Sequence, residues 1–200
     1  KRLRLTVSIS GEQDLLKNID FTTNRKVQIF DSSKMILTDT NYKPLAAVNF
    51  SRDTTNQKFT LKHSWKPGEN YKLIIYKEAF TDSAGIMLSK SDTLSFKTKD
   101  ESDYGSIRLH FNNLDMSVHP VLQILRQNEI VQSVILTTPD WFNKLTEPGE
   151  YELRILFNKK KNGIWDPGDY SKKIQPETVQ RIGRKLNVRG NIDNEVDINL

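Results

Sequence analysis

Apolar and polar residues alternate with a period of two along most of this chain. Phe59 and Leu61, for example, alternate with Thr60 and Lys62. A period of two places every second side chain on one face of a strand. The pattern therefore predicts half-buried strands with one wet face, which is typical of antiparallel sheets. The same alternation occurs at Val27 and Ile29, at Tyr71, Leu73 and Ile75, at Leu94 and Phe96, at Ile107, Leu109 and Phe111, at Tyr151, Leu153, Ile155 and Phe157, at Leu186 and Val188, and at Val196, Ile198 and Leu200.

Turn sequences separate these predicted strands at the spacing expected of β-sandwiches. The sequences Lys66-Pro67-Gly68 and Glu147-Pro148-Gly149 each precede a strand that contains a tyrosine. Proline fixes φ and glycine accepts a positive φ, so a Pro-Gly pair suits a type II turn. Only two passages have a helical composition, residues 11–19 and 138–145, and each predicts one or two helical turns.

A polar segment from Lys99 to Asp103 follows a closing strand and precedes a new alternating run. This change marks a domain border near residue 102. Two hundred residues are enough for two small domains. The prediction is an all-β chain of two tandem antiparallel β-sandwiches, residues 1–101 and residues 102–200.

The first half carries a Pro-Gly turn before a Tyr-containing strand, then a loop from Asp82 to Gly85, Leu88 and a closing Phe96-Lys97-Thr98 strand. From Lys26 to Thr98 this arrangement resembles the bacterial Ig-like domains of envelope and S-layer-associated proteins. The resemblance implies an Ig-like β-sandwich for residues 1–101.

The second half carries Pro148-Gly149-Glu150-Tyr151, a strand, and a loop that reaches Gly168. Here the chain resembles prealbumin-type (transthyretin-like) or Cna-B-type sandwiches. Together the two halves resemble the C-terminal part of Ig-like-domain lipoproteins in the outer envelope of Gram-negative bacteria. That resemblance implies export to the periplasm or cell surface. It also implies a lipid anchor to the outer membrane on a cysteine upstream of this chain, and no enzymatic activity.

The amino-acid composition limits the kinds of metal and partner that this chain is expected to bind. The chain has no cysteine, so it offers neither disulfides nor thiolate metal sites. The net charge of +5 is uneven: residues 1–99 contain 17 Lys and Arg against 10 Asp and Glu, whereas residues 100–200 contain 13 against 15. The lysines are dispersed and not clustered with arginines and aromatic residues. This pattern favours a solvated surface over nucleic-acid binding.

The sequence from Asn158 to Asp166 imitates a calcium-binding loop, which offers oxygen ligands at alternating positions and a glycine at the sixth. Asn158, Asn162 and Gly163 fit the first, fifth and sixth positions, but Lys160 occupies the third. An ammonium group repels a divalent cation, and the loop has few carboxylates. We therefore expect a structural turn with no bound metal and no cofactor.

Three aromatic side chains are candidate ligand-binding residues. Trp165 and Tyr170 lie in this same polar loop, and Trp141 lies beside Phe142. Exposed rings stack on sugars or anchor a partner protein, whereas buried rings cap the end of a sandwich core, and both interpretations remain open. Basic residues nearby form either a solvated strand face or a positive face suited to anionic glycans or phospholipid head groups. They are Lys159 to Lys161, Lys172, Lys173, Arg181, Arg184, Lys185 and Arg189.

The sequence shows no catalytic motif. His63, His110 and His119 lack metal-ligand spacing, and no nucleophile elbow or phosphate-binding loop is present. We expect a non-catalytic cell-envelope module of an exported protein that acts as a spacer or binds a protein or glycan at the cell surface. Membrane contact is expected only through the upstream lipid anchor. The alternatives are a carbohydrate-binding module that uses Trp141 or Trp165, and an accessory region of a larger hydrolase.

Overall fold

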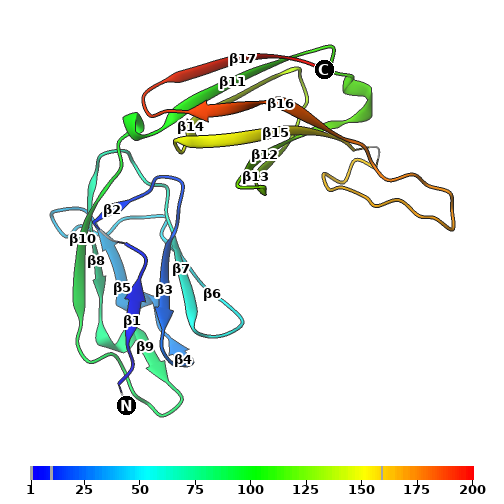
Figure 1. Cartoon of the computed structure of the whole chain (residues 1–200). Coiled ribbons are helices and arrows are strands. Elements are labelled where there is room, and N and C mark those ends of the chain that lie inside the picture. The colour runs from blue at the N-terminus through cyan, green and yellow to red at the C-terminus, as the bar shows by residue number, and fades with distance from the viewer. Residues whose placement is uncertain (1, 10, 159) are drawn as a thin grey trace. The chain divides into compact units, whose positions relative to one another are not determined.

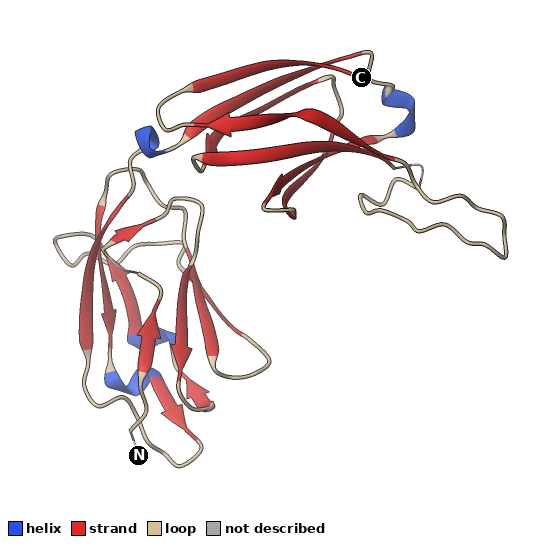
Figure 2. Ribbon diagram, viewed as in Figure 1, coloured by secondary structure: helices blue, strands red, loops and turns tan. Residues whose placement is uncertain are grey.

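The computed structural model describes residues 2–9, 11–158 and 160–200. The chain divides into two compact units, Lys1–Asp100 (unit 1) and Glu101–Leu200 (unit 2). The division falls inside the polar segment that marks the border in the sequence. In the described ranges the regular structure is strand apart from short 3-10 helices, so the fold is all-β (Figure 2). No helix found among these residues has the length and apolar character needed to span a membrane.

Unit 1 is a β-sandwich. Its larger sheets have the strand orders β1-β3-β7-β6 and β2-β10-β8-β5, and β4 pairs separately with β9 (Figure 1). The elements are β1 (Leu5–Val7), β2 (Glu12–Gln13), β3 (Ile19–Thr23), β4 (Val27–Phe30), η1 (Ser32–Lys34), β5 (Met35–Thr38), β6 (Asn49–Arg52), β7 (Lys58–Lys62), β8 (Asn70–Ile75), η2 (Lys77–Ala79), β9 (Phe80–Asp82) and β10 (Asp92–Thr98).

Alternate side chains of both large sheets form the core of unit 1. Phe59 and Leu61 on β7 are buried, as are Tyr71, Leu73 and Ile75 on β8. These residues belong to a single hydrophobic cluster. The period-two pattern therefore predicted the buried face of these strands correctly.

Phenylalanine rings fill one region of this core. The ring centroids of Phe30 and Phe59 are 4.7 Å apart, and those of Phe59 and Phe80 are 5.0 Å apart. Phe59 and Phe80 are fully buried. Aromatic pairs at these distances stabilise a core beyond the burial of their area. The β4–β9 pair is thus joined to the sandwich through side chains, although its backbone pairs with neither large sheet.

Unit 2 is a second sandwich with sheets of strand order β14-β11-β17 and β13-β12-β15-β16. Its core includes Ile107 and Leu109 from the first sheet and Leu153 and Ile155 from the second. The elements are η3 (Glu101–Asp103), β11 (Gly105–Asn112), η4 (Met116–Val118), β12 (Pro120–Arg126), β13 (Glu129–Ile135), β14 (Asp140–Thr146), β15 (Gly149–Phe157), β16 (Val179–Val188) and β17 (Asp193–Asn199).

The predicted helix at residues 138–145 is wrong, because this passage forms β14. Asp140–Thr146 pairs antiparallel with β11, and Leu109 lies opposite Trp141. Burial alternates along the strand: Trp141, Asn143 and Leu145 are partly buried, whereas Phe142 and Lys144 are exposed. The period of two was present in the sequence, but the Pro-Asp start favoured a helix.

The predicted helix at residues 11–19 is also wrong. Here β2 is followed by a turn, and side chains take the hydrogen bonds that a helix would make along its backbone. The carboxylate of Asp14 accepts the N–H of Leu16 at 2.9 Å. The amide of the buried Gln13 donates to the carbonyl oxygens of Asp14 and Lys17. Local side-chain bonds of this kind compete with helix formation.

Two further expectations need correction. The sheets are mainly antiparallel, but β2 pairs parallel with β10, and β11 pairs parallel with β17. Residue alternation alone does not specify strand direction. In addition, Ile29 does not share the buried face of Val27: the pairing of β4 shifts register between them, and Ile29 is 58% exposed. A register shift of one residue reverses the face of a side chain.

Candidate ligand-binding loop of unit 2

The long connection between β15 and β16, residues 158–178, carries the predicted ligand-binding residues Trp165 and Tyr170. It continues from the ends of these two strands as a projecting loop (Figure 1). Loops that a rigid scaffold positions often carry binding function. The scaffold here is the four-stranded sheet of unit 2, in which β15 pairs with both β12 and β16.

A buried carboxylate organises this loop. Glu177, the second residue before β16, is 6% exposed. Its Oε1 accepts the backbone N–H of Lys160 at 3.1 Å, and its Oε2 accepts that of Asp166 at 3.2 Å. Its own backbone N–H donates to the carbonyl oxygen of Asp166 at 3.0 Å. Glu177 therefore joins the two ends of the loop, a role that the sequence did not indicate.

Beyond Asp166 the loop forms a small hairpin. Asp169 and Ile174 exchange two backbone hydrogen bonds of 2.9 Å. Gly168 has φ +79°, and a Cβ there would collide with the carbonyl oxygen of Ile174, so this position requires glycine. The hydroxyl of Ser171 donates to Asp169 Oδ1 at 2.6 Å and lowers the pKa of that carboxyl. The hairpin thus has a defined conformation.

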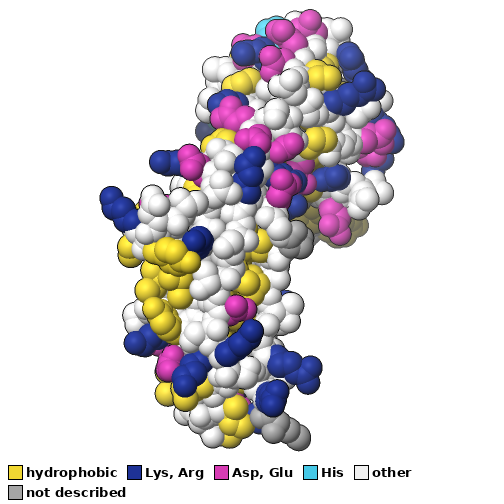
Figure 3. Space-filling view, turned by 90° about the vertical axis from the view of Figure 1, so that its left-hand side faces the viewer, with side chains coloured by type: hydrophobic (Ala, Val, Ile, Leu, Met, Phe, Trp, Pro, Cys, Tyr) yellow, Lys and Arg dark blue, Asp and Glu magenta, His cyan; other side chains and the backbone are white. Residues whose placement is uncertain are grey.

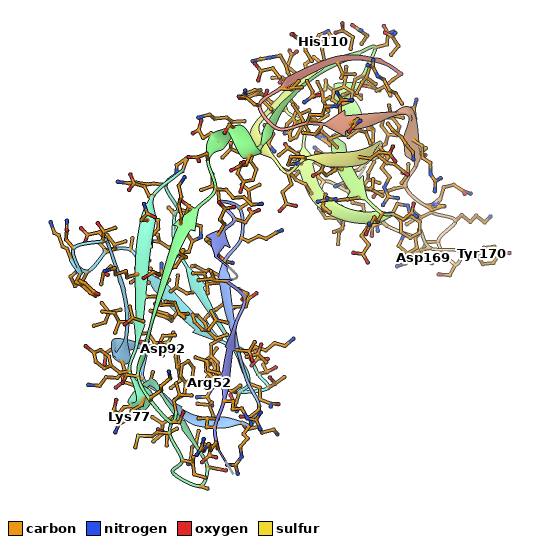
Figure 4. All side chains as sticks on the ribbon, turned by 60° about the vertical axis from the view of Figure 1, so that its left-hand side comes forward. Arg52, Lys77, Asp92, His110, Asp169 and Tyr170 are labelled. Atoms are coloured by element: carbon orange, nitrogen blue, oxygen red, sulfur yellow. The ribbon has the colours of Figure 1, made fainter. Side chains whose placement is uncertain are left out.

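Both aromatic candidates in the loop are accessible. Tyr170, at the hairpin tip, is fully exposed and points away from the sandwich (Figure 4). Trp165 is 50% exposed, and its indole Nε1 donates to the carbonyl oxygen of Glu177 at 2.8 Å. Ile164 and Ile174 are also exposed. The ring of Trp165 is therefore anchored at its polar edge and still presents half of its surface to solvent.

Trp141 does not join this group. It lies on β14, in the other sheet of unit 2, and packs partly buried against the hydrophobic core. Its neighbour Phe142 is 50% exposed, and the guanidinium of Arg108 lies 4.7 Å from the Phe142 ring centroid. The structure therefore gives Trp141 the role of a core ring, one of the two interpretations that the sequence left open.

Carboxylates pair with three of the eight described basic residues of the positive face predicted from the sequence. The ammonium group of Lys160 lies 3.0 Å from Asp166, that of Lys172 lies 3.2 Å from Asp169, and that of Lys185 lies 2.7 Å from Glu150. On the side of unit 2 that Figure 3 shows, which is turned away from the 158–178 loop, basic and acidic side chains are interspersed. Lys159 lies outside the described residues. These ion pairs reduce the positive charge of that face but do not cancel it.

The resemblance to a calcium loop also ends at Lys160. The Lys160 ammonium forms an ion pair with Asp166 Oδ1 at 3.0 Å, and the side-chain amide of Asn162 donates to Asp166 Oδ2, also at 3.0 Å. The hydrogen bond from Lys160 holds the pKa of Asp166 below its ordinary value. Asn158 is buried, and its Oδ1 has no hydrogen-bond partner among the described residues. Calcium takes six to eight oxygen ligands and favours carboxylates, and both oxygens of Asp166, the one carboxylate between Asn158 and Asp166, are already bonded within the protein.

Calcium is therefore expected neither to bind measurably nor to raise the melting temperature. Millimolar calcium added in a thermal unfolding experiment should leave the transition where magnesium or buffer leaves it. A calorimetric titration provides the direct measurement. A calcium site of about micromolar affinity, in the range of protein calcium sensors, would contradict the expectation.

The histidines form no catalytic cluster in the described part of the chain. Nδ1 of His110 lies 2.7 Å from Asp140 Oδ1 on the exposed surface of β11 and β14, and this hydrogen bond raises the pKa of His110. His63 packs edge-on against Trp65, with ring centroids 5.0 Å apart. No group of three or more histidines and carboxylates within reach of one metal ion occurs among the residues described.

No protein-family model and no curated protein matches the chain. Among solved structures, it is similar to native alpha-2-macroglobulin from Escherichia coli in a crystal structure spanning domains MG0-NIE-MG1, with 14% identity and a TM-score of 0.44 over 90% of this chain and 71% of that one. A cryo-EM reconstruction of the native conformation of the same protein has 13% identity and a TM-score of 0.46, and covers 90% of this chain but 14% of that chain.

The fibronectin(III)-like modules of CbhA from Clostridium thermocellum are similar at 12% identity and a TM-score of 0.26, over 96% of this chain and 95% of that one. These neighbours are bacterial proteins.

Proposed function

We propose that this chain is a non-catalytic module of an exported cell-envelope protein and that it binds a protein or glycan through the 158–178 loop. The observation that carries this proposal is that one loop of defined conformation exposes Tyr170 fully and Trp165 by half. Aromatic side chains that a fixed scaffold exposes to solvent are characteristic of recognition surfaces. Glu177 keeps the loop ordered in advance, which lowers the entropic cost of binding.

The proposal includes a finer domain identity. Unit 1 would be an Ig-like domain and unit 2 a prealbumin-like or Cna-B-like domain. Their support is that each unit is a two-sheet sandwich with its own hydrophobic core. The proposed location is the periplasm or cell surface, with a lipid anchor upstream of this chain. In this arrangement unit 1 acts as a spacer that displays the loop of unit 2.

A binding experiment on the intact chain tests this role. Fluorescently labelled protein is applied to a glycan array and to isolated bacterial envelope fragments. Replacing Tyr170 by alanine is expected to weaken binding about tenfold or more, the effect of losing one aromatic anchor. Tyr76→Ala is the matched control, because Tyr76 is also an exposed tyrosine but lies in unit 1. Equal binding by the two variants would contradict the assignment of the loop.

Accessibility of Trp165 is tested in the same protein by iodide quenching. Wild type should show a quenchable component that Trp165→Phe removes, because half of the indole is exposed. Trp141→Phe should leave that component in place, since Trp141 packs against the core. If Trp165 proves fully shielded, its role as a contact residue is lost. An upstream catalytic motif in the full-length gene product would instead favour the hydrolase-accessory alternative.

A further inference from the structure

Two arginines face each other on the outer surface of the four-stranded sheet of unit 2. Arg154 on β15 is directly opposite Arg181 on β16, and Gln123 on β12 is opposite Arg154. Leu153 and Ile155, which flank Arg154, belong to the core. Because side chains alternate along a strand, Arg154 points to the outer face of the sheet.

This arrangement leaves strong donors unused. Gln123 is 5% exposed, and its Oε1 accepts the Arg154 Nε–H at 2.7 Å. That bond fixes the plane of the guanidinium and leaves both of its Nη groups available. Within the described ranges no carboxylate pairs with Arg154 or Arg181. Like charges on directly opposite positions destabilise a sheet, so the pair is costly unless an anion joins it.

A hollow of about 440 Å³ lies at the same place. Both arginines line it, together with Lys185, Leu125, Glu152 and Asn128. Lys185 is already paired with Glu150, so the two guanidinium groups are the free cations of the site. A volume of this size falls within the range of small-molecule pockets.

We propose that this hollow binds the carboxylate of an acidic sugar. A guanidinium recognises a carboxylate through two parallel N–H donors, which a lysine cannot match. Leu125 and the partly buried Ile182 give the hollow an apolar wall for the face of one sugar ring. Glu152 and Asn128 also line the hollow and offer acceptors for ring hydroxyls, and the like charge of Glu152 directs the ligand carboxylate toward the two arginines. This site lies on the sheet face and is separate from the 158–178 loop, so it goes beyond the loop-binding role.

The test is an NMR titration of the intact chain with glucuronate at constant ionic strength. The Nε–H signals of Arg154 and Arg181 should shift and saturate together. Glucose, which lacks the carboxylate, and acetate, which lacks the ring, should each bind at least about tenfold more weakly, the loss expected when a charge-assisted bond or a buried apolar contact is removed. Shifts that never saturate, or acetate equal to glucuronate, would overturn the proposal.

Variants locate the site. Arg154→Gln and Arg181→Gln are each expected to weaken glucuronate binding about tenfold. Arg184→Gln removes the same charge from β16 outside the hollow and should bind as wild type does. The Arg181→Gln variant is expected to fold, since it relieves the repulsion between opposed charges. If either variant fails to fold, the melting temperature of the wild-type protein tests the site instead. Glucuronate must then raise that temperature, and glucose must not.

Discussion

Residues 1–100 and 101–200, produced as separate fragments, are each expected to fold. Each unit has its own core, and each closes two sheets without a strand from the other. The cut follows Asp100, just beyond the last backbone hydrogen bonds of unit 1. In these bonds the N–H of Lys99 donates to the carbonyl oxygen of Gln13, and the carbonyl oxygen of Lys99 accepts the N–H of Gly68. Circular dichroism and amide NMR dispersion should show two β-folded fragments whose spectra add to that of the whole chain.

A shorter fragment provides the control. Residues 1–91 lack β10, which lies between β2 and β8 in the second sheet of unit 1. Without β10 the core loses the buried Phe96, and the edges of β2 and β8 lose the strand that pairs with them. This fragment should therefore be unfolded. If fragments 1–100 and 101–200 are both unfolded, the units depend on each other and the two-domain interpretation fails.

The interior of each unit could be predicted from the sequence because burial and alternation are local properties. Ile107 and Leu109, or Val196 and Ile198, face the core wherever their strands are placed. The pairing of strands is not local. The parallel contact of β11 with β17 joins residues almost at opposite ends of unit 2, and no pattern within either strand specifies it.

The candidate site was predictable only in part, and for a similar reason. Trp165 and Tyr170 could be placed on one loop because turn residues surround them. The residues that hold or extend the site act across the fold. Glu177 bonds to Lys160 from the far end of the loop, and Arg154 meets Arg181 only through the pairing of β15 with β16. For Glu177 the sequence shows only that a glutamate follows Gln175-Pro176, and this position does not indicate that its side chain is buried.

Replacing Glu177 by alanine is expected to open the 158–178 loop and leave the sandwich of unit 2 folded. The change leaves the backbone N–H groups of Lys160 and Asp166 without their acceptors. Leaving a buried donor without its acceptor costs about 1–3 kcal/mol, and each 1.4 kcal/mol is a factor of about ten in the population of the open loop. The core of unit 2 contains no residue of this loop, so its strands should persist.

Limited trypsin digestion of the intact chain measures this opening, because Lys160, Lys161, Lys172 and Lys173 all lie in the loop. Cleavage there should be at least about tenfold faster in Glu177→Ala than in wild type, since proteolysis follows the population of the open form. Glu177→Gln keeps one acceptor oxygen and should fall between the two. Glu195→Ala, at an exposed glutamate on β17, is the control that should cleave like wild type. Unchanged cleavage in Glu177→Ala would mean that the carboxylate does not hold the loop, and the binding surface would then lack its predicted support.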